Sequence, residues 1–354
     1  GTVADIVPLL EENRIFTKFG MEQLNKSHWL GISMLIKKIF EDYKTKKFNT
    51  YDIGFIIAPI FNAAGRLEDA KRAVELFIEK DHRVCSEIIN ELLNNNTERK
   101  EIQEMILERA LFKIENEKLF EDSVLVVAEE GFHHGVIGIV ASKILDRYYK
   151  PTIIMEIKPE EGIATASCRS IEGFNMIEAL NTMKELFVKY GGHAGAAGFS
   201  IKIENINEFS KRINEYAKEN IPESSLIKPV KLDITIPAYK ISYDFIDKIS
   251  LLEPFGFGNP SPLFALNNCE ISGVRPIGKE KNHTMFNVRK DNLEIRNCVW
   301  FSSDDVFNEI ASISHADIAF KLKLETFKDK YMYKMYVEDM QLPRKEENIY
   351  ERYN

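Results

Sequence analysis

The chain has 354 residues, of which 44% are hydrophobic and 29% are charged. At roughly 150 residues per domain, this length predicts two or three domains, and the hydrophobic content excludes a largely disordered chain. The net charge of −8 argues against a histone-like, non-specific nucleic-acid binder, and no hydrophobic run is long enough to cross a membrane.

The cysteines and the start of the chain indicate where the protein works. Four cysteines lie far apart without a CxxC pair, and no signal peptide opens the chain. We therefore expect a protein of the reducing cytoplasm with neither a zinc site nor a disulfide scaffold.

The chain begins at Gly1 without an initiator Met, and the pattern of residues 1–10 predicts the end of a buried strand that carries Asp5. Because a domain rarely begins with its own core strand, we expect a fragment or a processed chain that lacks an N-terminal part.

The first 122 residues read as mostly helical. Residues 9–47 have apolar positions near helical spacing, with breaks expected around Gly20 and Gly31. Residues 51–66 are apolar and then turn-like, with Asn62 and Arg66 in the turn. Residues 68–122 predict one long helix that connects two domains.

The remainder divides into an α/β part and a β part. Residues 123–204 alternate between short buried strands and helices, including a helix from 174 to 190, and 205–219 form a further amphipathic helix. From residue 230 the period drops to two, which predicts a small β-barrel. The tail after Leu342 is charged.

A glycine-rich segment, GGHAGAAG at residues 191–198, is the strongest local signal for a site. Gly191 and Gly192 let backbone N–H groups approach a ligand closely, and His193 can donate to a phosphate oxygen or bind a metal. The alternative interpretation is a tight helix-to-strand turn with an incidental histidine.

Two further segments suit phosphate binding. A strand ends in Ser167, Arg169 and Ser170, and a planar cation beside neutral donors makes a phosphate clamp. His133 and His134 precede a predicted helix, whose N-terminus attracts anions, and we favour His133. The alternatives are a surface arginine with a capping serine, and histidines that only cap the helix.

Weaker signals complete the set of candidate residues. Asp5 could bind magnesium or manganese, although most single aspartates of this kind cap a helix. Asn62 and Arg66 could contact a ligand. In the predicted barrel, aromatic residues alternate with lysines, which suits stacked bases and neutralised phosphates of a single strand, or alternatively core packing. His283 shows no partnering pattern and is expected to be structural. The interleaved residues are Phe286, Trp300, Phe320, Phe327, Tyr331, Tyr333 and Tyr336, with Lys321, Lys323, Lys328, Lys330 and Lys334.

Six motifs recur together in the order of one family. They are GTVADIVPL, FNAAGRLEDA, GFHHGVIGIVASKI, SCRSIEGFN, GGHAGAAGF and PFGFGNPSPLF. From residue 1 to about 340, the chain resembles the bacterial RecJ family, the single-stranded-DNA-specific exonucleases of the DHH phosphoesterase superfamily. The resemblance implies an α/β fold followed by an OB-like β-barrel. The implied parts are the end of a DHH domain (1–80), a connecting helix (81–122), a DHH-associated domain (123–222), an OB-like domain (225–342) and a charged tail (343–354).

The resemblance also implies roles for individual residues. Asp5 falls on the family's last metal-ligand aspartate, of a site that holds two Mn²⁺ or Mg²⁺ ions. Ser167 and Arg169 fall on positions that hold the 5′-end phosphate, and His193 falls on a histidine that approaches the substrate phosphate. The earlier metal motifs, including the Asp-His-His triplet, have no counterpart here. His134 stands where the family usually has proline, and Ile60 or Phe61 where it has arginine.

The expected function follows from the resemblance. The parent protein is expected to be a 5′-to-3′ exonuclease on single-stranded DNA in DNA repair and recombination, with other repair proteins as partners and without membrane contact. Because one aspartate cannot hold two ions, we expect the 354-residue chain to be inactive alone. The alternatives are a DHH phosphodiesterase on short oligonucleotides or cyclic dinucleotides, and a non-catalytic chain that binds single strands.

Overall fold

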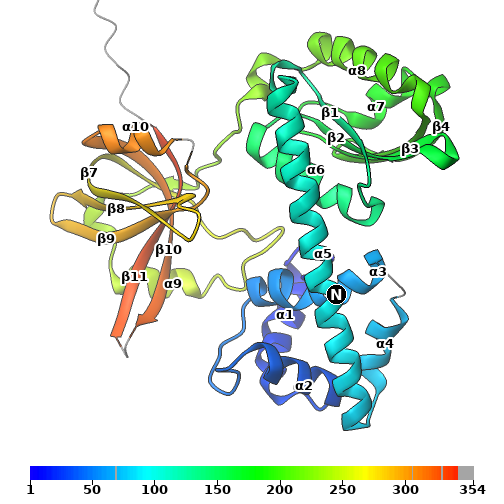
Figure 1. Ribbon diagram of the computed structural model, residues 1–354. Coiled ribbons are helices and arrows are strands. Elements are labelled where there is room, and N and C mark those ends of the chain that lie inside the picture. Colours follow the sequence, from blue (N-terminus) through cyan, green and yellow to red (C-terminus); the bar gives the residue numbers. More distant parts are fainter. Residues whose placement is uncertain (68–69, 305, 328–329, 342–354) are drawn as a thin grey trace, which may run out of the picture. The chain divides into compact units, whose positions relative to one another are not determined.

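The computed structural model describes residues 1–67, 70–304, 306–327 and 330–341 (Figure 1). The side chains of 67, 325–327 and 330–332 also lie outside the description, so the expected contacts of Phe327, Lys328, Lys330 and Tyr331 fall outside the described residues. The chain forms two compact units. The first unit combines Gly1–Met21 with Pro229–Asn354, and the second runs from Glu22 to Lys228.

The second unit begins with helices that pack around one long helix. They are α2 (Leu30–Ile39), α3 (Ala58–Leu67), α4 (Lys71–Ile78) and α5 (His82–Asn116). Their apolar faces form one core of fully buried side chains that includes Leu35, Leu76 and Ile88. Asp81 caps α5 by accepting from the backbone N–H groups of Arg83 and Val84, which fixes where this helix begins.

Several sequence-based expectations for this helical part were wrong. The helix expected over 68–122 is interrupted between α4 and α5. Residues 52–67 are helical rather than turn-like, so Asn62 and Arg66 lie one turn apart on α3. The break expected around Gly31 is present, since residues 27–29 are not helical and α2 begins at Leu30. Gly31 itself lies inside α2, where a Cβ would lie 2.1 Å from the carbonyl oxygen of Leu76. This glycine allows two helices to approach closely, and such a role leaves no signal in the local sequence.

A mixed sheet with helices on both faces forms the rest of the second unit (Figure 1). The strands lie in the order β1 (Leu125–Glu130), β2 (Thr152–Lys158), β3 (Ile163–Arg169), β5 (Ala196–Lys202) and β4 (Phe187–His193). Only β1 and β2 pair in parallel. One face packs against α5 and α6 (His134–Tyr148), and the other against α7 (Met176–Asn181) and α8 (Ile206–Asn220).

The glycine-rich segment lies in a β-hairpin, which corrects the helix expected over 174–190. The helix α7 ends at Asn181, and Phe187–His193 pairs with Ala196–Lys202 as β4 against β5. The pairing places Gly191 opposite Gly198 and Gly192 opposite Ala197. Helical spacing of apolar residues had suggested a helix, but the hydrogen bonds available from β5 decide in favour of a strand.

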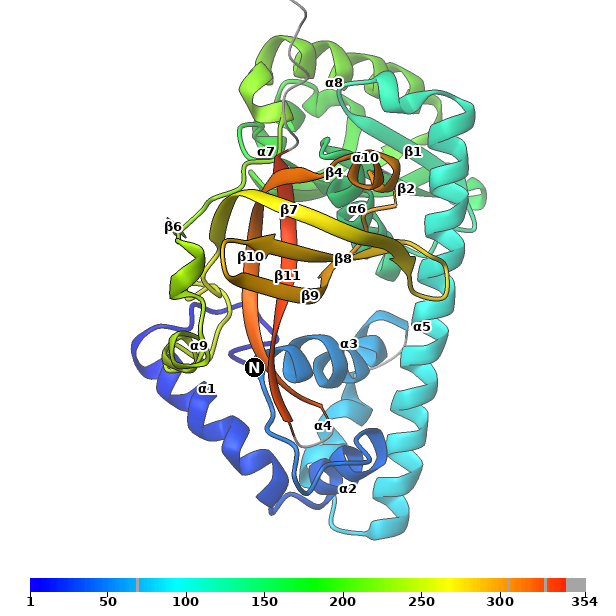
Figure 2. The ribbon, with the colours of Figure 1, turned by 90° about the vertical axis from the view of Figure 1, so that its left-hand side faces the viewer.

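The first unit contains a closed β-barrel, as the period-two pattern predicted (Figure 2). Its strands are β7 (Phe264–Ile277), β8 (His283–Lys290), β9 (Leu293–Trp300), β10 (His315–Phe327) and β11 (Lys330–Gln341). They are hydrogen-bonded in the order β7, β8, β9, β11, β10, and β10 pairs back to β7. The helix α10 (Phe307–Ser312) joins β9 to β10. This connectivity is that of an OB fold.

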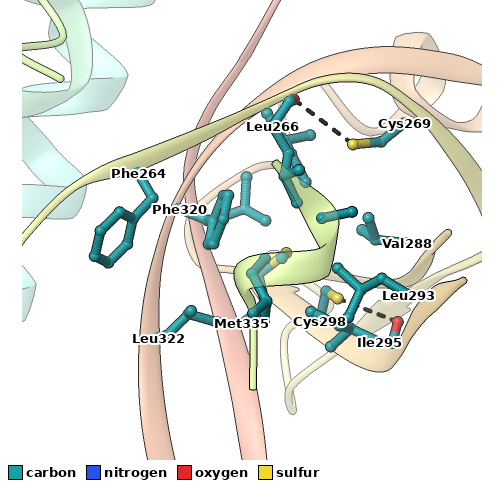
Figure 3. Packing of buried hydrophobic residues seen from close by; sticks show 14 of the residues in the cluster. Phe264, Leu266, Cys269, Val288, Leu293, Ile295, Cys298, Phe320, Leu322 and Met335 are labelled. Carbon is teal, nitrogen blue, oxygen red and sulfur yellow. Dashed lines mark hydrogen bonds between the residues drawn. The ribbon is translucent and has the colours of Figure 1, made fainter. Parts of the chain in front are cut away.

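Several aromatic residues that had been candidates for nucleic-acid contact lie in the barrel core. Phe286 and Phe320 are 1% and 0% exposed and lie in one cluster with Leu266, Val288 and Met335, several of which Figure 3 shows. Trp300 and Tyr333 pack against the same cluster. For these four residues the core-packing interpretation is confirmed. Two smaller elements complete the unit: β6 (Ile234–Thr235), shorter than the strand expected at 230–236, and α9 (Tyr243–Ser250).

The N-terminal residues form turns rather than the expected strand end. The backbone closes on itself, since Asp5 N donates to Gly1 O and Val7 N to Thr2 O, and no described strand pairs with it. Leu9 N then donates to Phe257 O at 2.7 Å. In the helix α1 (Glu11–Gln23), which runs through Gly20 without a break, Arg14 donates to two carbonyl oxygens of the loop before Phe257.

The PFGFG motif is explained by this contact. Gly258 has a φ of +77°, and a Cβ on it would lie 3.0 Å from the Cβ of Pro8. A Cβ on Gly256 would lie 2.6 Å from the side chain of Leu9. The two glycines therefore form the surface on which the N-terminal segment lies.

Candidate nucleic-acid interface

Arg169 lies at the end of β3, as the sequence predicted. Its side chain extends across the surface of the helix α6. Its Nε donates to the hydroxyl of Ser142 at 3.1 Å, and its Nη1 donates to the hydroxyl of Ser167 at 3.2 Å and to the carbonyl of Cys168 at 2.8 Å. Burial lowers the pKa of the Arg169 guanidinium below its ordinary value, and the positive charge of Arg66 also lowers it. All of its hydrogen-bond partners in the described structure are neutral.

A stripe of small residues on α6 makes room for this guanidinium. A Cβ on Gly138 would lie 2.9 Å from Ser167 Oγ and 3.0 Å from Arg169 Nη2. One turn earlier, a Cβ on Gly135 would lie 2.4 Å from the carbonyl oxygen of Arg66. Gly135, Gly138 and Ser142 thus share one helix face, and larger side chains would push Arg169 or the end of α3 away. This spacing of small residues is visible in the sequence.

Arg66 and Arg99 extend the positive charge beyond Arg169. Arg66 is exposed, and its Nη1 donates to the carbonyl of Gly135 at 2.8 Å. Arg99, on α5, is only 8% exposed and donates to Gln103 and Asn96 of its own helix, while its Nε has no partner. Burial lowers the pKa of Arg99, and the charge of Arg66 lowers it further.

The hydrogen-bond partners of these three arginines in the described structure are all neutral. Within the described residues none of the three pairs with a carboxylate, whereas Arg72, Arg109 and Arg212 each form an ion pair with a glutamate. In a chain of net charge −8, three neighbouring cations with neutral partners form a place where an anion is favoured. Arg99 was not among the candidates, because nothing in the sequence separates it from the charged face of a long helix.

The hairpin brings His193 into the same row of the sheet as Arg169. Ala196 pairs with Arg169 on one side and with His193 on the other. Paired residues point to the same face, so the two side chains lie on one face, about 10 Å apart across two strand spacings. His193 is exposed at the hairpin tip. Gly192 adopts a φ of +150°, and its Cβ would lie 2.5 Å from Ala197 Cα, so this glycine is required by the backbone.

Ser170 and His133 have local hydrogen bonds that account for them. The Ser170 hydroxyl donates to the carbonyl of Phe174 at 2.7 Å and closes the loop that lines a pocket of about 520 Å³ with Ala194 and Gly195. His133 is the N-cap of α6, and its Nδ1 accepts from Gly135 N at 3.1 Å. The ring of His134 stacks on it, 4.9 Å away. The predicted helix start is confirmed, and the capping interpretation describes His133.

Among the described residues, no cluster of possible metal ligands includes Asp5. It is exposed in a turn of the first unit, and nowhere in the described ranges do three His, Cys, Asp or Glu side chains gather as metal ligands would. Asn62 is exposed on α3, one turn before Arg66. The four cysteines are all buried and unbridged. No helix of the described part has the length and hydrophobicity that a membrane span requires.

Comparison with known proteins assigns each of the two sheets to a known type of domain. Residues 121–219 match the DHHA1 domain, and residues 232–339 match the RecJ OB domain. The chain thus joins a DHHA1 domain to an OB domain, which confirms the predicted α/β part and barrel. It is 33% identical to the single-stranded-DNA-specific exonuclease RecJ of Bacillus subtilis, over 96% of this chain and 43% of that protein. It is 32% identical to RecJ of Thermus thermophilus, over 82% of this chain and 40% of that protein.

Solved structures agree with these matches. The crystal structure of Thermus thermophilus RecJ in complex with Mn²⁺ superposes with a TM-score of 0.81 at 27% identity, over 97% of this chain and 48% of that one. The Mg²⁺ complex gives a TM-score of 0.78. The chain therefore belongs to the RecJ family, as the six motifs predicted. It spans about half the length of the relatives that it matches.

Proposed function

We propose that this chain is the part of a RecJ-type exonuclease that holds single-stranded DNA while a phosphodiester bond is hydrolysed from the 5′ end. The observation that carries the proposal is the guanidinium of Arg169, fixed by Ser142 and Ser167 without a carboxylate partner among the described residues. The relatives that match almost the whole chain are named as single-stranded-DNA-specific exonucleases, which supports the substrate class.

Each site residue has a proposed part in this function. Arg169 and Ser167 bind the 5′-terminal phosphate, because a planar fork with a neutral donor matches its oxygens. His193, in the same row of the sheet, orients the next phosphate toward the site of hydrolysis, and Gly191 leaves room for the DNA backbone. Arg66 and Arg99 provide further positive charge, and Asn62 and His133 lie beside this path.

A divalent metal ion, Mn²⁺ or Mg²⁺, is part of the proposal. Thermus thermophilus RecJ has been crystallised in complex with each of these two ions. Asp5 would supply one carboxylate oxygen ligand, and the other ligands would have to be further carboxylates or histidines, since none gathers around it in the described structure. A role in DNA repair and recombination, in the cytoplasm and with other repair proteins, fits the family and the four unbridged cysteines.

Binding of the strand end provides the test. The chain is mixed with 5′-phosphorylated and 5′-hydroxyl oligonucleotides in competition, at one salt concentration and with EDTA present. We expect Arg169→Ala to lose most of the preference for the phosphorylated end, roughly tenfold to a hundredfold in affinity, because a charge-assisted hydrogen bond is lost. Arg169→Lys should recover only part of it, since a point charge cannot make the bidentate contact.

The matched control is Arg212→Ala. Arg212 lies in the same unit but pairs with Glu185 and Glu208 at the surface, so its removal should leave the end preference unchanged. An unchanged preference in Arg169→Ala would show that Arg169 is a structural residue of the sheet.

Binding without hydrolysis is the second candidate function. It is favoured by the lack of a metal-ligand cluster in the described residues. Release of mononucleotides from a 5′-labelled strand in Mn²⁺, lost in Asp5→Ala, would exclude it.

A further inference from the structure

The linker between the two units, residues 222–232, is held at its start by Gly173. After α8 the chain forms a short 3-10 turn, η7 (Glu223–Leu226), in which Ser225 N donates to Pro222 O at 2.8 Å. The Ser225 side chain lies directly on Gly173, since a Cβ on that glycine would be 2.3 Å from Ser225 Oγ and 2.9 Å from Ser225 Cβ. Gly173 also has a φ of +95°, a conformation that residues with side chains rarely adopt. Only glycine therefore fits at this contact.

The loop that carries Gly173 is fixed on both sides. Ser170 N donates to Gly195 O at 2.9 Å, which ties the start of the loop to the tip of the β4–β5 hairpin. At the other end, Phe174 is 4% exposed, and its ring meets that of Tyr216 on α8 edge-on at 6.1 Å. The loop is therefore a rigid support for the turn that begins the linker.

The same loop begins at the end-binding site, by which we mean Arg169 and Ser167. Arg169 directly precedes Ser170 in the sequence. On the hairpin side, a Cβ on Gly195 would lie 3.9 Å from the ring of His193. A short, fixed loop thus connects the residues proposed to bind phosphates with the place where the linker leaves the second unit.

Beyond the contact with Gly173, the linker is irregular and exposed. Residues 227–232 form neither helix nor strand in the described structure, and each of them is exposed. In the first unit, Asp233 N donates to Leu263 O at 2.9 Å. Without the contact at Ser225, the free part would extend back to Pro222, because Ile221 packs against the core of the second unit. The contact therefore shortens the free part of the linker.

We propose that Gly173 and Ser225 are positioning residues, whose contact anchors the linker beside the end-binding site so that both units act on one DNA strand. The proposal rests on the proposed function. OB folds bind oligonucleotides, and the first unit contains such a fold. Two binding modules joined by a linker have an effective concentration for each other that falls with about the −3/2 power of linker length, or more steeply. The anchor thus raises the affinity for long strands although neither residue touches DNA.

The test compares the affinities of the 354-residue chain for a 5′-phosphorylated 20-mer and a 5′-phosphorylated 4-mer of thymidylate, with EDTA present. In Ser225→Leu the larger side chain does not fit against Gly173 and should lift the turn away. We expect the 20-mer to lose roughly twofold or more in affinity, because the free linker lengthens from 227–232 to 222–232. The 4-mer, which occupies the end-binding site alone, should bind as in wild type. Ser224→Leu is the matched control, since Ser224 is exposed in the same turn.

Proteolysis tests the anchor without DNA. Cleavage after Glu223 by a glutamate-specific protease requires the turn to leave the surface. We expect faster release of fragments 1–223 and 224–354 from Ser225→Leu and from Gly173→Ala than from wild type and Ser224→Leu. Thermal unfolding checks that the variants are folded.

A longer linker tests the same idea with Gly173 and Ser225 intact. Insertion of about twelve Gly and Ser residues after Pro229 should lower the affinity for the 20-mer by roughly fivefold and leave the 4-mer unaffected. An affinity for the 20-mer that stays the same or rises, in Ser225→Leu or in the insertion variant, would overturn the proposal. Unchanged cleavage after Glu223 in Ser225→Leu would also overturn it, because the contact would then not hold the linker.

The wild-type chain separates failure of the anchor from failure of the proposed function. If wild type binds the 20-mer no more tightly than the 4-mer, the two units do not act on one strand and the anchor has no such role. The preference for a 5′-phosphorylated end, lost in Arg169→Ala, would still support the proposed function. If wild type binds neither oligonucleotide, the proposed function itself is wrong.

Discussion

Arg169 and Lys323 are both cations without a carboxylate partner among the described residues, yet they are presented in different ways. Arg169 is half-buried across the glycine face of α6, and three hydrogen bonds fix its guanidinium. Lys323 is exposed on a strand, beside an aromatic ring and opposite another lysine. A fixed fork can distinguish a terminal phosphate from an internal one, whereas a flexible ammonium contributes charge without geometry.

The difference suggests that the two regions bind different parts of one polymer. The surroundings of Arg169 suit a single chemical group, the end of the strand. The surroundings of Lys323, where the rings of Phe301 and Tyr336 stack, suit any base, because every base has a face on which an aromatic ring can stack. Variants that disturb one region and spare the other therefore test the comparison.

The largest effect is expected from Gly138→Val. The new side chain would start 2.9 Å from Ser167 Oγ and 3.0 Å from Arg169 Nη2, and its branched Cβ could not turn away. We expect loss of the 5′-phosphate preference and a destabilisation of about 1–3 kcal/mol from overpacking. Competition binding and thermal unfolding measure the two effects. Gly191→Ala is the control for unfolding, since a Cβ there meets nothing within 4 Å. If Gly138→Val kept the end preference, the proposed role of the small residues on α6 would be contradicted.

A smaller effect is expected from Arg66→Gln. Glutamine removes the positive charge but keeps an N–H donor for the carbonyl of Gly135. If Arg66 acts through its charge, affinity for single strands should fall by roughly tenfold or less, with stability nearly unchanged. Removing the charge should also let the pKa of Arg169 return toward its ordinary value, because Arg66 lowers it. Unchanged affinity in Arg66→Gln, together with weaker folding in Arg66→Ala, would assign Arg66 a structural role only.

The smallest effect is expected from Lys323→Gln, and it lies in the salt dependence. For single strands, each phosphate contact contributes about −0.7 to the slope of log affinity against log salt concentration. The slope should therefore become shallower by about this amount, while the discrimination between 5′-phosphate and 5′-hydroxyl ends stays as in wild type. Titrations between low and moderate salt measure it. A slope that does not change would mean that no phosphate lies at Lys323.

The sequence predicted the parts of the molecule that depend on local pattern. The barrel strand β8 alternates between buried and more exposed residues, His133 precedes a helix with a run of apolar residues, and Arg169 ends a strand; each was placed correctly. The six ordered motifs predicted the family. The roles of Asp5, His193 and the other site residues remain predictions.

What the sequence missed depends on contacts between distant segments. Arg66 meets Gly135, and Phe301 meets Tyr336, only after the α3–α6 packing and the barrel register are set. Phe286 was left open between nucleic-acid contact and core packing, and Phe301 was not a candidate, because a period of two does not reveal which face of a closed barrel is inside. Apolar spacing also suggested a helix where β4 forms, because it does not reveal the hydrogen bonds that β5 offers.

The contact between the N-terminal segment and the PFGFG motif determines when each unit can finish folding during protein synthesis. Leu9 is hydrogen-bonded to Phe257, and Arg14 to Leu251 and Glu253. The first unit is therefore made of two distant segments of the sequence, and the second unit is inserted between them in the sequence. On the ribosome, residues 22–228 can fold as soon as they emerge, whereas residues 1–21 must wait for a partner made more than two hundred residues later. Such a long loop closure makes the first unit the slower to assemble.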